Sequence, residues 1–450
     1  MSPLLPPLAR LAAPVVALVA LTGGLVACTR ADATSAAAPA AAASASPSAS
    51  PSASHDHTTT GVANKGAGTA ATDDEGAAGG VRLQALLGQH TVLAADMMRA
   101  RIRQDPDFAQ AAEAALTRNT QALSTLVGSL FGPAAASSFA ERWAAHVTYL
   151  FDYAEARRTR DTAGQQQARQ RLLRAELGIS SFFADASKGR LSRAAATQAV
   201  RLHVDQLLEQ ADAYASGRYA VAAAAYRHGY EHGYRLGGAL ARALLPAADV
   251  AALDTPGWQL RSNLTELLGE HVALVVAATR AASGPTTADF AALGDTLNAN
   301  TRGLAGAVGT LFGAPAAGRF QELWADHVDA LMTITSAAAR GDTAAQQRAE
   351  RSLRAFEPTL AAFLDTATQS RIGAEALARA YVQHDRMLVD QVKAHQAKDY
   401  TKAHDLGYRA YTEMFDLAAQ LSNAIQLTLG TKLPRGGSQT GGGGTADGTP

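Results

Sequence analysis

The stretch FQELWADHVDAL, residues 320–331, decides the fold because the chain carries a second version of it, FAERWAAHVTYL, at residues 139–150. Trp143 and Trp324 are 324 minus 143, or 181, positions apart, and the same shift separates the histidines of the two stretches. The aromatic, histidine and leucine residues recur every three or four positions, which is the period of a helix with one buried face. The two stretches therefore predict a helical unit that occurs twice.

A shift of 181 positions relates the two halves of the chain over most of their length. The copies span residues 82–246 and 263–430, and residues 247–262 form the linker between them. Gly, Pro and Asp divide each copy into about six helix-length segments, and short connections place consecutive helices antiparallel. We therefore predict an all-α protein with two tandem homologous bundles of up-down antiparallel helices, about six in each.

Composition excludes several classes of function. The 450 residues include 40 basic and 40 acidic side chains, so there is no net positive charge to attract nucleic acid. Alanine-rich sequence with Leu, Arg, Gln and Glu favours helices because these side chains lose little rotamer freedom there. The single cysteine, Cys28, excludes an internal disulfide and a thiolate zinc site, so any metal must be bound by nitrogen or oxygen.

The N-terminal residues indicate export and attachment to a membrane. An apolar run ends at Leu25-Val26-Ala27-Cys28, and this tetrapeptide resembles the lipobox of bacterial lipoproteins. The resemblance implies a signal peptide at residues 1–28, a lipidated Cys28, and a mature protein anchored to the cell membrane on its extracytoplasmic side. A plain membrane anchor or a secretory signal is the alternative interpretation.

Low-complexity segments flank the two copies. Residues 29–81 are rich in Ala, Ser, Pro and Thr and cannot offset the entropy of ordering by burial, so they are predicted to form a disordered tether. The Gly-rich residues 431–450 are predicted to form a disordered tail. The tether would present the bundles to an unknown protein partner in the cell envelope.

Six histidines occupy matched positions in the two copies, on the apolar faces of three different helices. They are His90, His146 and His203 in the first copy and His271, His327 and His384 in the second. Because alternate helices of an up-down bundle run parallel, histidines roughly ten residues from each helix start fall at one level. Asn119 and Asn300 lie on the second helix of each copy at that level, where the amide can hydrogen-bond an imidazole and orient it toward an ion.

Three imidazoles without a thiolate suit Zn(II), Cu(II) or Fe(II), and copper or zinc is the expected ion; one coordination position is left open. Because an imidazole must be neutral to bind a metal, occupancy is expected to fall below about pH 6. The sequence thus predicts a transition-metal site in each copy, with histidines satisfied inside a hydrophobic core as the alternative. In that alternative the protein serves as an interaction or spacer module of the cell envelope.

The sequence contains no nucleophile elbow, phosphate-binding loop, dinucleotide fingerprint or HExxH zinc motif. Acidic residues that could act as a base are not matched between the copies, since Asp385 corresponds to Val204. His228 and His232 are four residues apart on one predicted helix, but Glu413 takes the place of the second in the other copy. A metal-dependent hydrolase, in which an open zinc position activates water, is a second alternative.

The repeated elements LLGEH, LFG and WADH, together with the late histidine, resemble a group of secreted bacterial helical proteins labelled copper amine oxidase-like. The resemblance covers roughly residues 82–430. Copper amine oxidases need a tyrosine in an Asn-Tyr-Asp/Glu context to form their quinone cofactor, and this sequence contains no Asn-Tyr pair. Their large β-sandwich is also missing, so oxidase activity is not expected.

Overall fold

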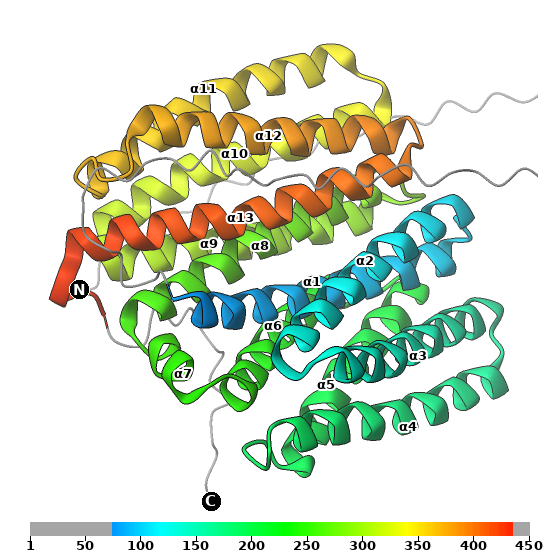
Figure 1. Ribbon diagram of the computed structural model, residues 1–450. Helices are drawn as coiled ribbons and strands as arrows, with labels where there is room; N and C mark the ends of the chain where they lie inside the picture. Colours follow the sequence, from blue (N-terminus) through cyan, green and yellow to red (C-terminus); the bar gives the residue numbers. More distant parts are fainter. Residues whose placement is uncertain (1–73, 435–450) are drawn as a thin grey trace, which may run out of the picture. The chain divides into compact units, whose positions relative to one another are not determined.

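The computed structural model describes residues 74–434, and this part of the chain is built from helices without any strand. The first repeat contains α1 (Glu75–Arg103), α2 (Pro106–Phe131), α3 (Pro133–Thr159), α4 (Thr162–Ala186), α5 (Arg193–Ala215) and α6 (Tyr219–Leu244). The second contains α8 (Pro256–Ala282), α9 (Thr287–Phe312), α10 (Ala314–Arg340), α11 (Thr343–Ala367), α12 (Ala374–Gln396) and α13 (Tyr400–Leu429). Helix α7 (Ala247–Leu253) joins them, and a 3-10 helix, η1 (Gly430–Lys432), follows α13 (Figure 1). The prediction of an all-α protein with two tandem bundles is confirmed.

Several predicted segments lie outside the described residues. These are the signal peptide at residues 1–28 with Cys28, most of the tether at residues 29–81, and most of the tail at residues 431–450. Within residues 74–434, no helix combines the length and the apolar character that crossing a membrane requires.

Helix α1 begins at Glu75, so it includes residues that composition assigned to the tether. The Asp74 carboxylate caps the helix by accepting a hydrogen bond from the Ala77 backbone N–H at 2.8 Å. A Cβ placed on Gly80 would lie only 2.8 Å from Leu253 Cδ1. The small residues before position 82 were the reason for predicting a tether there. In the structure they allow the first turns of α1 to pack closely against α7.

The predicted linker at residues 247–262 is largely helical. It contains α7 and the first turns of α8, which starts at Pro256. Proline is suited to the first helical position because the N–H that it lacks would have no partner there. Trp258 is fully buried two residues later. The structure differs from the prediction because Pro256 begins a helix inside the predicted linker.

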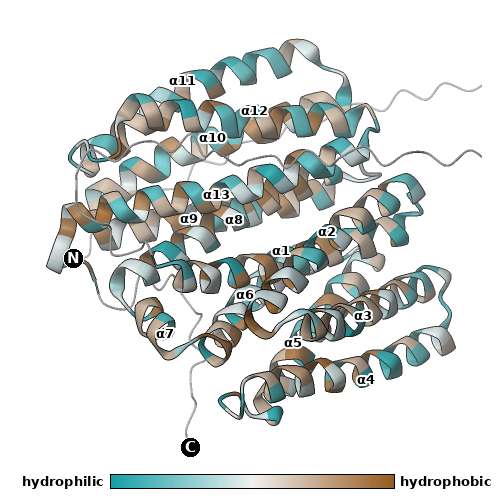
Figure 2. Ribbon diagram, in the orientation of Figure 1, coloured by the Kyte–Doolittle hydropathy of each residue, from teal (hydrophilic) through white to brown (hydrophobic). Residues whose placement is uncertain are grey.

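Helices α1 and α8 occupy the centres of their bundles. Helix α1 packs against α2, α3, α5 and α6, and α8 packs against α9, α10, α12 and α13. Every residue from Leu83 to Ala100 is buried. Small residues permit this packing, since a Cβ on Gly237 of α6 would lie 2.4 Å from Gln84 Cα. Figure 2 shows many hydrophilic residues on α11. This helix packs less closely against the central helix α8 than α9, α10, α12 and α13 do.

The two repeats pack together through matching surfaces. Helix α2 contacts α13, the corresponding α9 contacts α6, and the central helices α1 and α8 contact each other. Tyr230 and Tyr411 are 181 positions apart, and their hydroxyl oxygens lie 3.1 Å from each other. Tyr411 donates to Ala85 O at 2.9 Å, and Tyr230 donates to Glu266 O at 3.1 Å. Because these acceptors are also 181 positions apart, the repeats are related by a local two-fold axis, as subunits of a symmetric dimer are.

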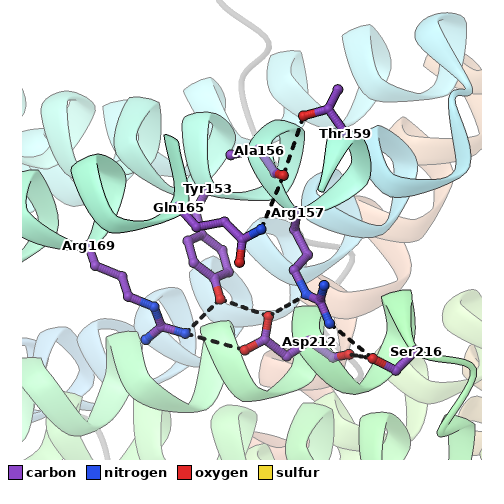
Figure 3. A network of polar contacts seen from close by, with 8 residues as sticks. All are labelled: Tyr153, Ala156, Arg157, Thr159, Gln165, Arg169, Asp212 and Ser216. Atoms are coloured by element: carbon purple, nitrogen blue, oxygen red, sulfur yellow. Dashed lines mark hydrogen bonds and ion pairs between the residues drawn. The ribbon is translucent and has the colours of Figure 1, made fainter. Parts of the chain in front are cut away.

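A salt bridge between the fourth and fifth helices shows how the repeats have diverged. Figure 3 shows the Asp212 carboxylate of α5 between the side chains of Arg157 and Arg169. Arg157 Nε lies 2.9 Å from Asp212 Oδ1, and Nη2 of Arg169, on α4, lies 3.3 Å from Oδ2. In the second repeat the positions of Arg169 and Asp212 are taken by Glu350 and Lys393, which form an ion pair at 3.1 Å. The charges have exchanged places, and the contact between the two helices is kept.

The glycines beside the tyrosine pair predict a cost for even the smallest side chain. A Cβ on Gly269 of α8 would lie 2.5 Å from the Tyr230 hydroxyl oxygen and 2.9 Å from Tyr411 Cε2. We expect Gly269→Ala to lower the free energy of unfolding by about 1–3 kcal/mol, although alanine has the better helix propensity. The control is Gly318→Ala on α10, where nothing lies within 4 Å and stability should rise by about 0.5–1 kcal/mol. Urea denaturation measures both, and a stabilised Gly269→Ala protein would contradict the close packing.

Candidate metal centre

Three histidines of the first repeat converge inside the bundle. His90 comes from α1, His146 from α3 and His203 from α5, and none is more than 3% exposed. One ring nitrogen of each lies within 4.8 Å of the other two. The Nε2 atoms of His90 and His146 are 3.3 Å apart, and about 3.3 Å is also the separation expected for two nitrogens on one tetrahedral metal. The convergence predicted from the sequence is confirmed for this repeat, and the cluster can bind a metal.

An aromatic face of α3 forms one side of the cluster. Phe139 and Trp143 stack with ring centroids 5.1 Å apart. The Trp143 ring lies 4.7 Å from the His90 ring and 4.8 Å from the His146 ring. The indole also makes a polar contact, because its N–H donates to His90 Nδ1 at 3.2 Å. Helical spacing alone accounts for this arrangement, since these α3 residues follow one another at intervals of three or four positions.

Two of the imidazoles are oriented by hydrogen bonds through Nδ1. His146 Nδ1 lies 2.8 Å from Trp143 O, and a carbonyl can only accept, so this nitrogen carries the ring proton. The Thr91 hydroxyl donates to Leu87 O at 3.1 Å, so its oxygen accepts from His203 Nδ1 at 3.3 Å. Both histidines thus leave Nε2 unprotonated, as outer hydrogen bonds do for metal-binding histidines. His203 Nε2 has no hydrogen-bond partner among residues 74–434.

Burial keeps these imidazoles neutral. It lowers the pKa of His146 to about 4, although the hydrogen bond to Trp143 O acts in the opposite direction. Burial, and then the charge of neighbouring histidines, also lowers the pKa of His90 and His203 well below the usual 6.5. The expectation that metal occupancy falls below about pH 6 assumed an imidazole in water. Inside the bundle this limit moves toward pH 4, because burial disfavours the protonated ring.

The asparagines do not orient the histidines. The Asn119 amide donates to Leu86 O and to Gln89 Oε1, both at 3.0 Å. Asn300 makes the corresponding hydrogen bonds in the second repeat, at 2.9 and 2.7 Å. The predicted bond to an imidazole is replaced because the central helix itself presents a carbonyl and a side-chain oxygen to each amide. These contacts fasten α2 to α1 and α9 to α8.

The second repeat reproduces only part of the cluster. His271 and His327 keep the close contact, with Nε2 atoms 3.4 Å apart. The His384 ring centroid lies 6.4 Å from that of His271, whereas the corresponding distance in the first repeat is 5.4 Å. Among the described residues, only the trio of the first repeat brings three candidate ligand atoms within 4.8 Å of one another. The two sites predicted from the repeat are therefore not equivalent.

Substitutions around His384 account for this difference. The position of Thr91 is occupied by Val272, which cannot accept a hydrogen bond. Neither ring nitrogen of His384 has a hydrogen-bond partner in the described part of the chain. His384 Nδ1 instead lies 3.6 Å from Glu413 Oε2, where the first repeat has His232. The third histidine of the second repeat is thus drawn toward a carboxylate.

Asp385 of α12 is a buried acidic side chain. It is 2% exposed, its Oδ1 lies 3.7 Å from His327 Nδ1, and neither oxygen has a hydrogen-bond partner among the described residues. Burial, and then the charges of Glu357 and Glu413, raise the pKa of this carboxyl well above 3.8. The first repeat has Val204 at this position. The difference between Asp385 and Val204 can be read from the sequence, but the burial of the Asp385 carboxyl cannot.

The sequence did not reveal two polar contacts of the cluster, the one between Thr91 and His203 and the one between Trp143 and His90. The hydroxyl of Thr91 could have been noticed, because the shift of 181 aligns it with a valine. The polar role of Trp143 has no such signal, because the matched position is also a tryptophan. His228 and His232 form no site together, since the first is exposed and the second places Nε2 2.9 Å from Ala199 O.

Comparison with known proteins adds no assignment to this site. No protein family model, no curated protein and no solved structure matches the chain. Its chemistry is therefore inferred from its own residues.

The buried carboxyl predicts a stability that depends on pH. Between pH 3.8 and its raised folded pKa, Asp385 keeps a proton in the native state that the unfolded chain releases, so stability falls as the pH rises. Asp385→Asn removes this proton release, and we expect it to raise the free energy of unfolding at neutral pH by about 1–3 kcal/mol. The gain should vanish below about pH 3.8, where the carboxyl is protonated in both states.

The control for this variant is Asp329→Asn, because Asp329 is an exposed acidic residue of the same bundle. Its effect should stay within about 0.5 kcal/mol at either pH. Urea denaturation at neutral and acidic pH compares the two variants. A destabilised Asp385→Asn protein at neutral pH would show that the carboxylate is charged and compensated in the folded chain.

Proposed function

We propose that the first repeat binds a transition-metal ion through His90, His146 and His203, and that copper is the metal. The observation that carries this proposal is the buried Nε2 of His203, an unprotonated nitrogen without a hydrogen-bond partner in the described residues. An unsatisfied buried acceptor costs about 1–3 kcal/mol. An ion held by the three ring nitrogens within 4.8 Å of one another would remove that cost.

The ligands favour an ion of low charge. All three are neutral imidazoles, so a bound ion would keep its full charge in an interior from which solvent is excluded. The cost of burying a charge grows with its square, which makes Cu(I) about four times less costly than a divalent ion. Imidazole is also a suitable copper ligand. Zinc is the nearest rival, because a tetrahedral zinc site has a similar nitrogen separation.

Burial supports binding of an ion rather than catalysis. A metal-dependent hydrolase must bring its substrate to the metal, and the three histidines are at most 3% exposed. We therefore propose that the protein sequesters or senses copper. A lipidated Cys28 would place this activity on the extracytoplasmic side of the membrane, at the end of the tether of residues 29–81. An envelope protein that delivers or accepts the ion is the partner that this role implies.

One metal ion per chain is the expected stoichiometry, because among residues 74–434 only the first repeat brings three ligands together. The protein is refolded from urea with Cu(I) or with Zn(II), since the buried site is most accessible in the unfolded chain, and bound metal is measured after desalting. His203→Ala should abolish binding, whereas the matched variant His384→Ala should keep about one equivalent. Circular dichroism checks that both variants fold. Two equivalents in the native protein, or loss in both variants, would contradict a single site in the first repeat.

Metal retention should extend to acidic pH. Protons compete with the ion for Nε2, and burial lowers the pKa of His146 to about 4, so this competition begins only near that pH. The loaded protein is dialysed at a series of pH values, and we expect it to keep its metal at about pH 5 and to lose it below about pH 4. A flexible peptide with three histidines, which titrate near pH 6.5, is the control and should lose metal near about pH 6. Release of the protein-bound ion at the same pH as the peptide would place the ion at an exposed site.

A further inference from the structure

The indole N–H of Trp143 is one of two contacts that place the ring proton of His90, and the other is with His146 Nε2. An indole nitrogen can only donate, so His90 Nδ1, which lies 3.2 Å away, must accept. A neutral imidazole has a single ring proton, and that proton is therefore on Nε2 of His90. His146 and His203 have the opposite arrangement, with the proton on Nδ1. One histidine of the trio is thus in the form that cannot bind an ion through Nε2.

The proton on His90 Nε2 completes a closed set of hydrogen bonds. His90 Nε2 donates to His146 Nε2 at 3.3 Å, and His146 Nδ1 donates to Trp143 O at 2.8 Å. The set begins at the Trp143 indole N–H and ends at the carbonyl of the same residue, and every donor in it meets an acceptor. We call these three hydrogen bonds the Trp143 cycle. In the metal-free protein they leave only His203 without a partner for its Nε2.

We propose that Trp143 regulates the metal site by holding His90 in the tautomer that opposes the ion, so that metal binding must open the Trp143 cycle. For His90 Nε2 to bind an ion as a neutral ligand, its proton must move to Nδ1. Two N–H groups would then face each other across the 3.2 Å between Trp143 and His90. The indole must therefore give up this hydrogen bond. The ring keeps one proton throughout, so no net proton is released by the exchange.

The second repeat provides a natural comparison. Trp324 occupies the matched position, but neither its indole nitrogen nor His271 Nδ1 has a hydrogen-bond partner among residues 74–434. The ring centroids of this pair are 5.0 Å apart, against 4.7 Å for Trp143 and His90. The tautomer of His271 is therefore not set by its tryptophan. Trp324→Phe removes an indole without removing such a hydrogen bond, which makes it the matched control.

The first test uses the full metal-free chain. The ring nitrogen shifts of isotope-labelled histidine distinguish the two neutral tautomers, and the His90 signals are assigned by their loss in His90→Ala. We expect the proton on Nε2 in the native protein and in Trp324→Phe. In Trp143→Phe we expect a partial shift of population toward Nδ1, because the hydrogen bond from His90 Nε2 to His146 Nε2 remains. A native His90 that already carries its proton on Nδ1 would overturn the proposal. A merely structural role of Trp143 would leave the tautomer unchanged.

The second test measures affinity, and it rests on the proposed function. After refolding with copper, Trp143→Phe should bind the ion about two- to tenfold more tightly than the native protein, because one opposing hydrogen bond is gone. Trp324→Phe should bind like the native protein. Equal or weaker binding by a folded Trp143→Phe would overturn the regulatory role. If none of these proteins binds metal while His90 still carries its proton on Nε2, the proposed function fails and the Trp143 cycle stands as a structural feature alone.

Discussion

Each bundle depends on one central helix that is buried on nearly all sides. Little of the middle of α1 or α8 is exposed to water, so a buried polar group there must be satisfied by the protein or remain unsatisfied at a cost of about 1–3 kcal/mol. Alanine and glycine make such a central helix possible by letting neighbouring backbones approach. The histidines on it are consequently neutral, and each ring nitrogen meets at most a few defined groups. This is why proton positions can be argued from the geometry.

The two repeats share their helix packing but differ in the polar groups around the third histidine. The asparagine contacts and the short Nε2 separation occur in both repeats, and each repeat contributes one tyrosine to the pair between them. The surroundings of the third histidine differ, since Thr91 orients His203 whereas Val272 leaves His384 without a comparable acceptor. The nearby carboxyl of Asp385 then introduces an acid that the first repeat lacks. A repeat therefore predicts backbone and packing more securely than it predicts a set of ligands.

Periodicity and the shift of 181 were enough to predict the helices, the two bundles and the inward position of the six histidines. The start of α1 and the helical linker were missed, because small residues and Pro256 acquire their role only from the partner surface. Asn119 was assigned to an imidazole because a buried amide needs a partner, but the sequence does not say which oxygen lies nearest. The indole contact of Trp143 was also missed, since a tryptophan on an apolar stripe looks the same whether its N–H is bonded or not.

A hydrogen-bonded pair of imidazoles and a metal-bound pair have nearly the same nitrogen separation, so the 3.3 Å between His90 and His146 fits both. The two cases differ in the ring protons, because a hydrogen-bonded pair has a proton between the two nitrogens and a metal-bound pair does not. In the first repeat three nitrogens converge but one tautomer opposes the ion. In the second repeat the tryptophan does not fix the tautomer of His271, and no three ligand atoms among the described residues there lie within 4.8 Å of one another. The opposition is modest, because a hydrogen bond contributes about 0.5–1.5 kcal/mol and a structural zinc ion about 10–16 kcal/mol. Trp143 can therefore tune the affinity of the first site without being able to prevent an ion from entering it.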